Sequence, residues 1–305
     1  MHFVPSEPCN SVRSTVTTIN HIIINMTEAI GSFPFGRPVL KVCQKDRTQK
    51  KVFVLGVYAS AVHAQWVDKK DALLIRAVAV DSEPEIFWRG DGAEKIIKGI
   101  ELPPGAGRLL PPSEKLNGPS GLALDSEFLD PLALIRKDVW LCDLVPYSCR
   151  NPAQDQALRN KYKPLEKPFS LPDYSQWKEV PKVLADDDRI HEILDEFRSA
   201  SPEIIITLGD QPLKWFVRKV SNDRRCKLAD YGETDETYGR LHDIEIEGRK
   251  LLLLPLVHPR QAAKLGRYSP VWFNRHDEWK KTTALSIKSM FQDLQGQYEF
   301  SWPEQ

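Results

Sequence analysis

The sequence predicts an α/β protein, a three-layer α/β/α fold with a central, mostly parallel four-stranded sheet. Four short apolar runs predict the strands, at 51–57 (KVFVLGV), 138–145 (DVWLCDLV), 203–208 (EIIITL) and 250–257 (KLLLLPLV). They lack polar alternation, which is typical of strands buried on both faces. Helical patterns lie between them, and strands that alternate with helices favour a parallel sheet.

The helices are predicted from apolar residues spaced three and four apart. The segment 188–200 (DRIHEILDEFRSA) follows an acidic cap, and 210–220 and 277–294 show the same periodicity. The apolar face of the first segment holds Ile190, Ile193, Leu194 and Phe197. A further stretch at 73–80, followed by 85–88, is expected to form an added hairpin.

Length and charge limit the class of protein. The chain has 305 residues and carries 42 basic and 42 acidic side chains, so its net charge is zero. This balance excludes a globally basic DNA-coating protein but allows a local basic patch. We expect a single domain over 1–305, with an N-terminal extension at 1–45 and inserted loops or a hairpin at 60–115 and 150–182.

Targeting and cysteine patterns indicate a cytoplasmic protein. No apolar run approaches the ~20 residues of a membrane helix, and the first residues lack the basic stretch of a signal peptide. The five cysteines show no CxxC spacing, which argues against a disulfide framework or a zinc site. We therefore expect reduced thiols, no membrane partner and a monomer.

The residues after each predicted strand mark the expected site, because ligands of open parallel sheets bind outside the carboxyl ends of the strands. The GxGxxG, GxxxxGK[ST], HExxH and GxSxG motifs do not occur. The four strand ends instead bring together a glycine, an aromatic ring, a carboxylate, an imidazole and a guanidinium. These residues are Gly56, Tyr58, Asp143, His258 and Arg260.

Five segments, in order over roughly 50–275, carry a resemblance to a known family. They are VFVLGVYAS (52–60), NGPSGLAL (117–124), VWLCDLVP (139–146), PEIIITLGDQPL (202–213) and LLLLPLVHPRQAAK (251–264). Together they resemble the uracil-DNA glycosylase superfamily. The resemblance implies an enzyme that flips a nucleotide out of DNA and hydrolyses the bond between base and sugar.

The resemblance also implies roles for individual residues. His258 would donate a hydrogen bond or positive charge to the departing base, and the loop after it would enter the minor groove. Asp143 stands where the family has its base-reading Asn, and Leu116 where it has a stacking Phe. Gly56, Tyr58, Asp143 and Leu116 are thus the expected base-binding residues, with His258 and Asp143 catalytic.

Besides Asp143, three departures from the family pattern change these expectations. Tyr58 stands at the position of the water-activating residue and is not a base at neutral pH. Either Glu85 or Asp81 replaces it, or the reaction is dissociative and needs little base assistance. Tyr147 stands where the iron–sulfur branch has a cluster ligand, so we expect no cofactor. Phe87 or Trp88 either supplies the stacking face or belongs to the core.

Asp143 is the most informative departure. An amide matches uracil, because it accepts from N3–H and donates to O4, whereas a carboxylate cannot donate to O4. Cytosine offers an amino donor at N4, which a carboxyl group accepts, and a proton shared with N3 completes the pair. Mismatched buried polar edges cost several kcal/mol, or roughly 10³-fold in discrimination. The sequence therefore predicts excision of a cytosine-type base.

Excision of ordinary cytosine would destroy the cell's own genome, so we expect a second requirement. A 5-substituted or glycosylated cytosine, as in some phage DNA, meets it, and the small Leu116 and the long inserts would make room for the substituent. Defence against phage with modified DNA follows as a hypothesis.

Contacts to DNA, double- or single-stranded, are expected near the last strand. The stretch 249–281 holds eight Lys or Arg against two acidic residues, a local charge of +6, which suits phosphate contact. Arg260, Lys264 and Arg267 are the expected DNA-binding residues, and Leu265 is a candidate wedge. Ser120 either caps the helix that follows it or contacts phosphate.

Three alternatives remain open from sequence. The first is a glycosylase for uracil or another deaminated base. The second is a catalytically inactive member that binds DNA or a nucleotide. The third is an enzyme that acts on free nucleosides.

Overall fold

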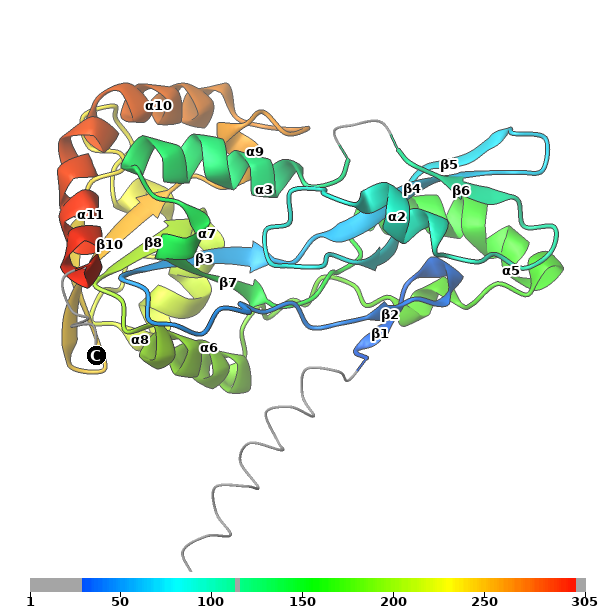
Figure 1. The fold of residues 1–305 in the computed structure, drawn as a ribbon, viewed down its shortest axis with the longest axis horizontal. Coiled ribbons are helices and arrows are strands. Elements are labelled where there is room, and N and C mark those ends of the chain that lie inside the picture. Colours follow the sequence, from blue (N-terminus) through cyan, green and yellow to red (C-terminus); the bar gives the residue numbers. More distant parts are fainter. Residues whose placement is uncertain (1–28, 113–115, 300–305) are drawn as a thin grey trace, which may run out of the picture.

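A five-stranded sheet forms the centre of one half of the molecule (Figure 1). The computed structural model describes residues 29–112 and 116–299, so residues 1–28 of the expected extension at 1–45 lie outside the described residues, as do 113–115 of the expected insert. In spatial order, the strands are β7 (Val139–Val145), β3 (Val52–Tyr58), β8 (Ile204–Leu208), β10 (Arg249–Leu256) and β9 (His242–Ile246).

The prediction of a mixed α/β fold with a mostly parallel sheet is confirmed. The four predicted strands are β3, β7, β8 and β10, and every pairing among them is parallel. All residues of β7 and β8 are buried, which explains why their sequences are apolar on both faces.

The predicted count of four strands is wrong. A fifth strand, β9, pairs antiparallel with β10 at the edge of the sheet. Its sequence HDIEI alternates, with Ile244 and Ile246 buried and the residues between and before them at least partly exposed. An edge strand of this kind needs no continuous apolar run, so the pattern that predicted the other four did not apply to it.

Helices cover both faces of the sheet. Figure 1 shows α3 and α10 on one side of it and α6 and α8 on the other. The helical segments of this half are α3 (Pro119–Ala123), η2 (Leu124–Leu129), η3 (Asp130–Leu132), η4 (Arg136–Asp138), α6 (Asp187–Ala200), α7 (Asp210–Pro212), η7 (Leu213–Val217), α8 (Arg218–Val220), η8 (Leu228–Asp230), α9 (Pro259–Ala262), α10 (Pro270–Lys281) and α11 (Thr283–Glu299).

Two of the three predicted helices match the structure. The helix predicted at 188–200 is α6, whose cap is Asp186, and that predicted at 210–220 is the continuous run from α7 to α8. The single helix predicted at 277–294 is wrong, because α10 ends at Lys281 and α11 begins at Thr283. Thr282 between them has non-helical backbone angles (φ −126°, ψ −85°).

A second hydrophobic core lies in the other half of the molecule. We call this half the insert lobe, and the half that holds the five-stranded sheet the sheet lobe. A three-stranded antiparallel sheet in the order β5-β4-β6 lies in the insert lobe. Its elements are β1 (Gly31–Ser32), η1 (Pro34–Gly36), β2 (Pro38–Val39), β4 (Ala61–Val67), β5 (Leu73–Ser82), α2 (Ala93–Lys98), β6 (Arg108–Leu110), α4 (Pro152–Ala157), η5 (Leu158–Tyr162), α5 (Lys163–Phe169) and η6 (Tyr174–Gln176).

Aromatic side chains from distant segments build the core of the insert lobe. Phe35, Trp66 and Tyr162 pack with ring centroids 5.2–5.6 Å apart. The expected inserts at 60–115 and 150–182 therefore contact each other here. The hairpin predicted from 73–80 and 85–88 is wrong, because β5 pairs with β4 instead, and 85–88 contain a bend and a turn but no strand. None of the helices in the described ranges combines the length and apolar character of a membrane span.

Candidate functional site

A cavity of about 400 Å³ lies where the two lobes meet, at the carboxyl ends of β3, β7 and β10. Six of the residues expected at the site from sequence line it: Tyr58, Leu116, Ser120, Asp143, His258 and Arg260. Strands β3 and β7 point toward the insert lobe (Figure 1), whose β4 and α4 supply further wall residues. The cavity falls within the size range of ligand pockets.

Gly56 creates the space in which the Asp143 carboxyl sits. The two residues are direct partners on the parallel strands β3 and β7. A Cβ at Gly56 would lie 2.2 Å from Asp143 Oδ1 and 2.6 Å from Phe87 Cζ. A side chain at this position therefore cannot coexist with the observed carboxyl and ring, although Gly56 itself is not part of the cavity wall.

The Asp143 side chain is 4% exposed, and within the described ranges no donor lies in hydrogen-bonding distance of its carboxyl oxygens. Burial raises the pKa of this carboxyl to about 7, against an opposing effect of the Arg189 charge and with a further rise from Glu196. Near neutral pH, Asp143 thus exchanges between an acceptor-only carboxylate and a carboxylic acid that also donates.

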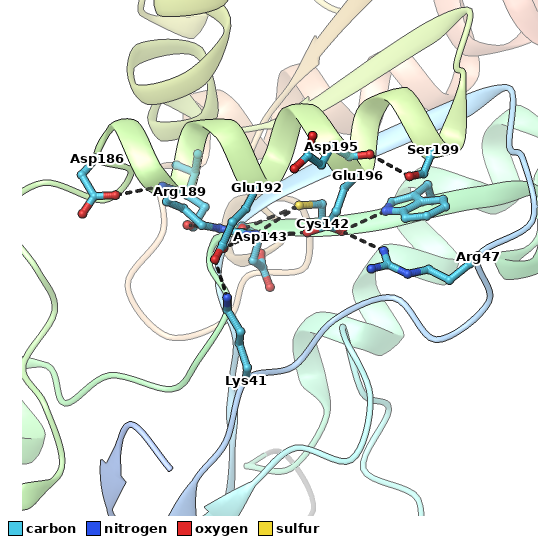
Figure 2. A network of polar contacts seen from close by, with 12 residues as sticks. Lys41, Arg47, Cys142, Asp143, Asp186, Arg189, Glu192, Asp195, Glu196 and Ser199 are labelled. Carbon is cyan, nitrogen blue, oxygen red and sulfur yellow. Dashed lines mark hydrogen bonds and ion pairs between the residues drawn. The ribbon is translucent and has the colours of Figure 1, made fainter. Parts of the chain in front are cut away.

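Arg189 holds the backbone of β7 at this point. Figure 2 shows it reaching from α6 toward Asp143. Its guanidinium donates to the main-chain oxygens of Asp143 (2.7 Å) and Leu144 (3.1 Å). Glu192 and Glu196 balance the buried charge at 2.8 and 3.4 Å. The Arg189 guanidinium therefore holds the main chain of β7 at Asp143, while the Asp143 carboxyl remains available to a ligand.

His258 caps the short helix α9, and its Nδ1 accepts from the Arg260 N–H at 3.1 Å. Burial, with the Arg260 charge, lowers the pKa of His258 to about 4. The imidazole is therefore neutral at pH 7. Because Nδ1 is an acceptor, the proton resides on Nε2, which makes His258 a neutral hydrogen-bond donor.

A chain of buried polar groups fixes the backbone just before His258. The Val257 N–H donates to the Tyr238 hydroxyl at 3.0 Å, which in turn lies 2.8 Å from His276 Nδ1. His276 Nε2 is 3.0 Å from the Glu127 carbonyl oxygen. Sequence reasoning gave these residues no role, because a tyrosine and a histidine 38 positions apart carry no local pattern.

Glu83 is a buried cavity carboxyl that sequence reasoning missed. It follows directly after β5, is 5% exposed and lines the cavity. Its Oε1 accepts from the Ser60 N–H at 3.1 Å, in the turn between β3 and β4. Burial raises its pKa to about 8, and the Asp143 charge contributes to the rise.

The sequence-based candidates on either side of Glu83 do not face the cavity. Asp81 is paired with Arg37 at 2.8 Å, and Glu85 is not among the residues of the wall. The acidic stretch DSEPE (81–85) indicated that a carboxyl could lie here. Which of its three carboxyls faces the cavity depends on the path of the chain after β5 ends at Ser82.

Aromatic rings also line the cavity. Phe87, which has a left-handed backbone (φ +52°), and Trp88 both contribute. Phe87 belongs to the core of the sheet lobe and Trp88 to that of the insert lobe. Each ring thus belongs both to a core and to the cavity wall, and stacking on a base stays a prediction.

The loop 116–121 is pinned to the insert lobe. The Asn117 side chain accepts from the His63 N–H (2.8 Å) and donates to the His63 carbonyl (3.0 Å). The prediction that Ser120 caps the next helix is wrong, because the cap residue of α3 is Gly118 (φ +74°), which places Ser120 inside the helix. The Ser120 side chain lines the cavity instead.

The insert lobe adds a polar section to the wall. His63, Ser148, Asn151 and Gln154 line the cavity, and the side-chain nitrogens His63 Nε2 and Gln154 Nε2 are 3.4 Å apart. Burial lowers the pKa of His63, so this ring is neutral at pH 7. Such a section suits hydroxyl or amide groups of a ligand rather than an ion.

The expected DNA-binding residues differ in their surroundings. Arg260 lines the cavity and donates to the Leu265 carbonyl at 3.0 Å. Leu265, the candidate wedge, also lines it. Lys264 and Arg267 are exposed but outside the cavity wall, and the Lys264 ammonium lies 3.9 Å from the centre of the Phe273 ring.

The local charge of +6 counted over 249–281 overstates the positive charge at the site. Lys280 is paired with Glu127 and Asp277, and Lys281 with Asp277 at 2.6 Å. Arg249 begins β10, at the opposite end of the strand, and donates to the Pro202 carbonyl at 3.1 Å. The count along the sequence already included Asp277, but it could not include Glu127 or show that Arg249 lies at the far end of β10.

Within the described residues, no group of three or more His, Cys, Asp or Glu side chains is placed to hold a metal ion. The thiols of Cys43, Cys142, Cys149 and Cys226 are free. Neither a scan against models of known protein families nor a search of curated proteins gave a match for this chain.

Proposed function

We propose that this protein is a divergent member of the uracil-DNA glycosylase superfamily that flips a modified, cytosine-type base out of DNA and excises it, leaving an abasic site. One observation carries the proposal. A buried carboxyl without a hydrogen-bond partner, Asp143, lines the same cavity as a neutral histidine, His258, at the carboxyl ends of parallel strands.

Asp143 would recognise the base. One oxygen accepts from the N4 amino group of cytosine, and the other shares a proton with N3. The pKa of about 7 supports this role, because the group can supply that proton near neutral pH. A base protonated or hydrogen-bonded at N3 is also a better leaving group.

His258 would stabilise the departing base. Its neutral Nε2–H donates to the base oxygen O2, where negative charge develops as the bond to C1′ breaks. A donor placed at such an atom typically contributes 10²- to 10³-fold to the rate. The hydrogen bond is the role that the lowered pKa favours over positive charge.

The remaining wall favours a substituted base. A pyrimidine ring with its exocyclic groups has eight non-hydrogen atoms, which at about 30 Å³ each, the share of a water molecule, fill at most about 240 Å³. The cavity of about 400 Å³ leaves room for more. The polar section from the insert lobe offers partners for a hydroxylated or glycosylated substituent. Defence against phage with modified DNA remains the biological hypothesis.

A second candidate, excision of uracil, is favoured by the same raised pKa. When protonated, the Asp143 carboxyl carries a donor and an acceptor side by side, as a carboxamide does. It could then accept from N3–H of uracil and donate to O4. The two candidates differ in the substrate that the wild type prefers.

Product analysis with a panel of DNA duplexes and single strands tests the proposal. Each would hold one cytosine, 5-hydroxymethylcytosine, glycosylated 5-hydroxymethylcytosine or uracil. We expect release of a modified cytosine and abasic sites. Release of uracil alone would select the second candidate, and binding of DNA without release of any base would contradict both.

A further inference from the structure

The cavity holds a second carboxyl for which base recognition has no use. Asp143 and Glu83 line the same wall and are 4% and 5% exposed. They come from different lobes, one from β7 and one from the end of β5. Hydrolysis of the bond between base and sugar needs two proton movements, one toward the base and one away from water, and paired carboxyl groups suit such a division of roles.

Glu83 has the firmer position of the two. Its Oε1 is held by the Ser60 N–H at 3.1 Å, directly after β3 ends at Tyr58. Tyr58, with a pKa raised by burial, stays a neutral hydroxyl and cannot take a proton from water at neutral pH. His258, with its acceptor Nδ1 engaged by the Arg260 N–H, has no lone pair left for water either.

We propose, on the basis of the proposed function, that Glu83 is the catalytic base that takes a proton from the attacking water, and that Asp143 supplies the proton that the leaving base receives. The water oxygen forms the new bond to C1′, and its proton goes to Glu83. The bond between C1′ and N1 breaks, and its electron pair stays on the base, which takes the Asp143 proton at N3. The pair holds one proton before and after the reaction, so its return from Glu83 to Asp143 resets the site.

The electrostatics of the pair give this scheme a pH signature. The charged or titratable groups around it are Arg136, which faces Glu83, Arg189 and Glu196, which face Asp143, and Tyr58, His63, Cys149, His258 and Arg260 of the shared wall. Burial, with a smaller rise from Glu196, raises the pKa of Asp143 to about 7, and burial, with a smaller rise from the Asp143 charge, raises the pKa of Glu83 to about 8. Below both values the pair holds two protons and has no base, and above both it has no proton for N3. Between them the single proton resides mainly on Glu83, which has the higher pKa, so the reactive arrangement with the proton on Asp143 is the minor tautomer and reaches its highest population in this pH range.

The test measures single-turnover base release by the full-length protein on the preferred DNA from the substrate panel, from acid to alkaline pH. We expect a bell-shaped profile for the wild type, with its maximum between about 7 and about 8. Glu83→Gln should lower the rate by roughly 10²- to 10⁴-fold, lose the acid limb and keep the affinity for DNA. The amide oxygen of Gln can still accept from Ser60, so a structural role would survive the substitution.

Two further variants complete the design. Glu85→Gln is the matched control, since this neighbouring carboxyl is outside the cavity wall, and it should behave as wild type. Glu83→Ala should regain part of its rate with formate, which brings a carboxylate of its own. A fully active Glu83→Gln, or a wild-type rate that does not fall on the acid side, would overturn the role of Glu83 alone. A wild type that releases no base from any DNA would overturn the function on which it rests.

Discussion

The sheet lobe and the insert lobe wall one cavity with different chemistry. The sheet lobe supplies Asp143, His258 and Tyr58 from strand ends that are packed on both faces. The insert lobe supplies Glu83 and a set of neutral polar groups from β4, α4 and the loops around its own core. The comparison teaches that the groups that would recognise the base belong to strand ends of the sheet lobe, whereas those that would contact its substituent and the attacking water belong to the insert lobe.

The largest expected effect concerns base recognition by the sheet lobe. Asp143→Asn fixes a donor and an acceptor at all pH values, so preference should move from cytosine-type bases toward uracil by roughly 10³-fold. The ratio of excision rates on modified cytosine and uracil measures it. An unchanged ratio would mean that base recognition lies elsewhere in the wall.

His258→Ala should lower the single-turnover rate by about 10²- to 10³-fold while DNA binding is kept, because it removes one donor to the leaving base. His191→Ala, on the exposed side of α6, is the control. Since the pKa of His258 is about 4, the wild-type rate should show no titration of this group between pH 5 and 8. Equal losses in both variants would argue against a specific role.

Gly56→Ala tests how closely the groups of the sheet lobe must be placed, since the added methyl would meet both the Asp143 carboxyl and the Phe87 ring. Displacement of reacting groups by about 1 Å typically costs 10²-fold in rate, and we expect a loss of this order. Gly99→Ala, whose Cβ would make contacts of 3.4 Å or longer, should stay active. Full activity of the Gly56 variant would show that neither group is needed where it lies.

Much of the sheet lobe could be predicted from the sequence, because strands buried on both faces must be apolar throughout. The carboxyl ends of these strands also pointed to Asp143 and His258. The insert lobe could not be predicted in the same way. Shifts in register between β4 and β5, near His63 and Trp66, break the alternation that would have revealed the pairing, and Glu83 therefore stayed hidden between Asp81 and Glu85.

The link between the lobes should be measurable as stability. Asn117→Ala removes two hydrogen bonds to the His63 backbone, and we expect the free energy of unfolding in urea to fall by about 1–3 kcal/mol. Asn117→Asp keeps the acceptor and should lose less. Equal stability of the wild type and the Ala variant would show that the loop 116–121 is held by other contacts.

The smallest expected effect concerns DNA. Arg260→Gln should reduce the slope of log Kd against log salt concentration by about 1, the effect of one lost phosphate contact. Lys281→Gln is the control, because its ammonium is already paired with Asp277. Equal slopes for both variants would place the phosphate contacts away from α9.

The two long segments of the insert lobe follow the carboxyl ends of β3 and β7, which are neighbours in the sheet. The lobe therefore covers one half of that edge, whereas β8 and β10 are followed by short turns into α7 and α9. Arg260 lies on the second of these sides, in the wall of the cavity. Under the proposed function, a nucleic-acid strand would therefore cross the ends of β8 and β10 and turn a single nucleotide into the cavity.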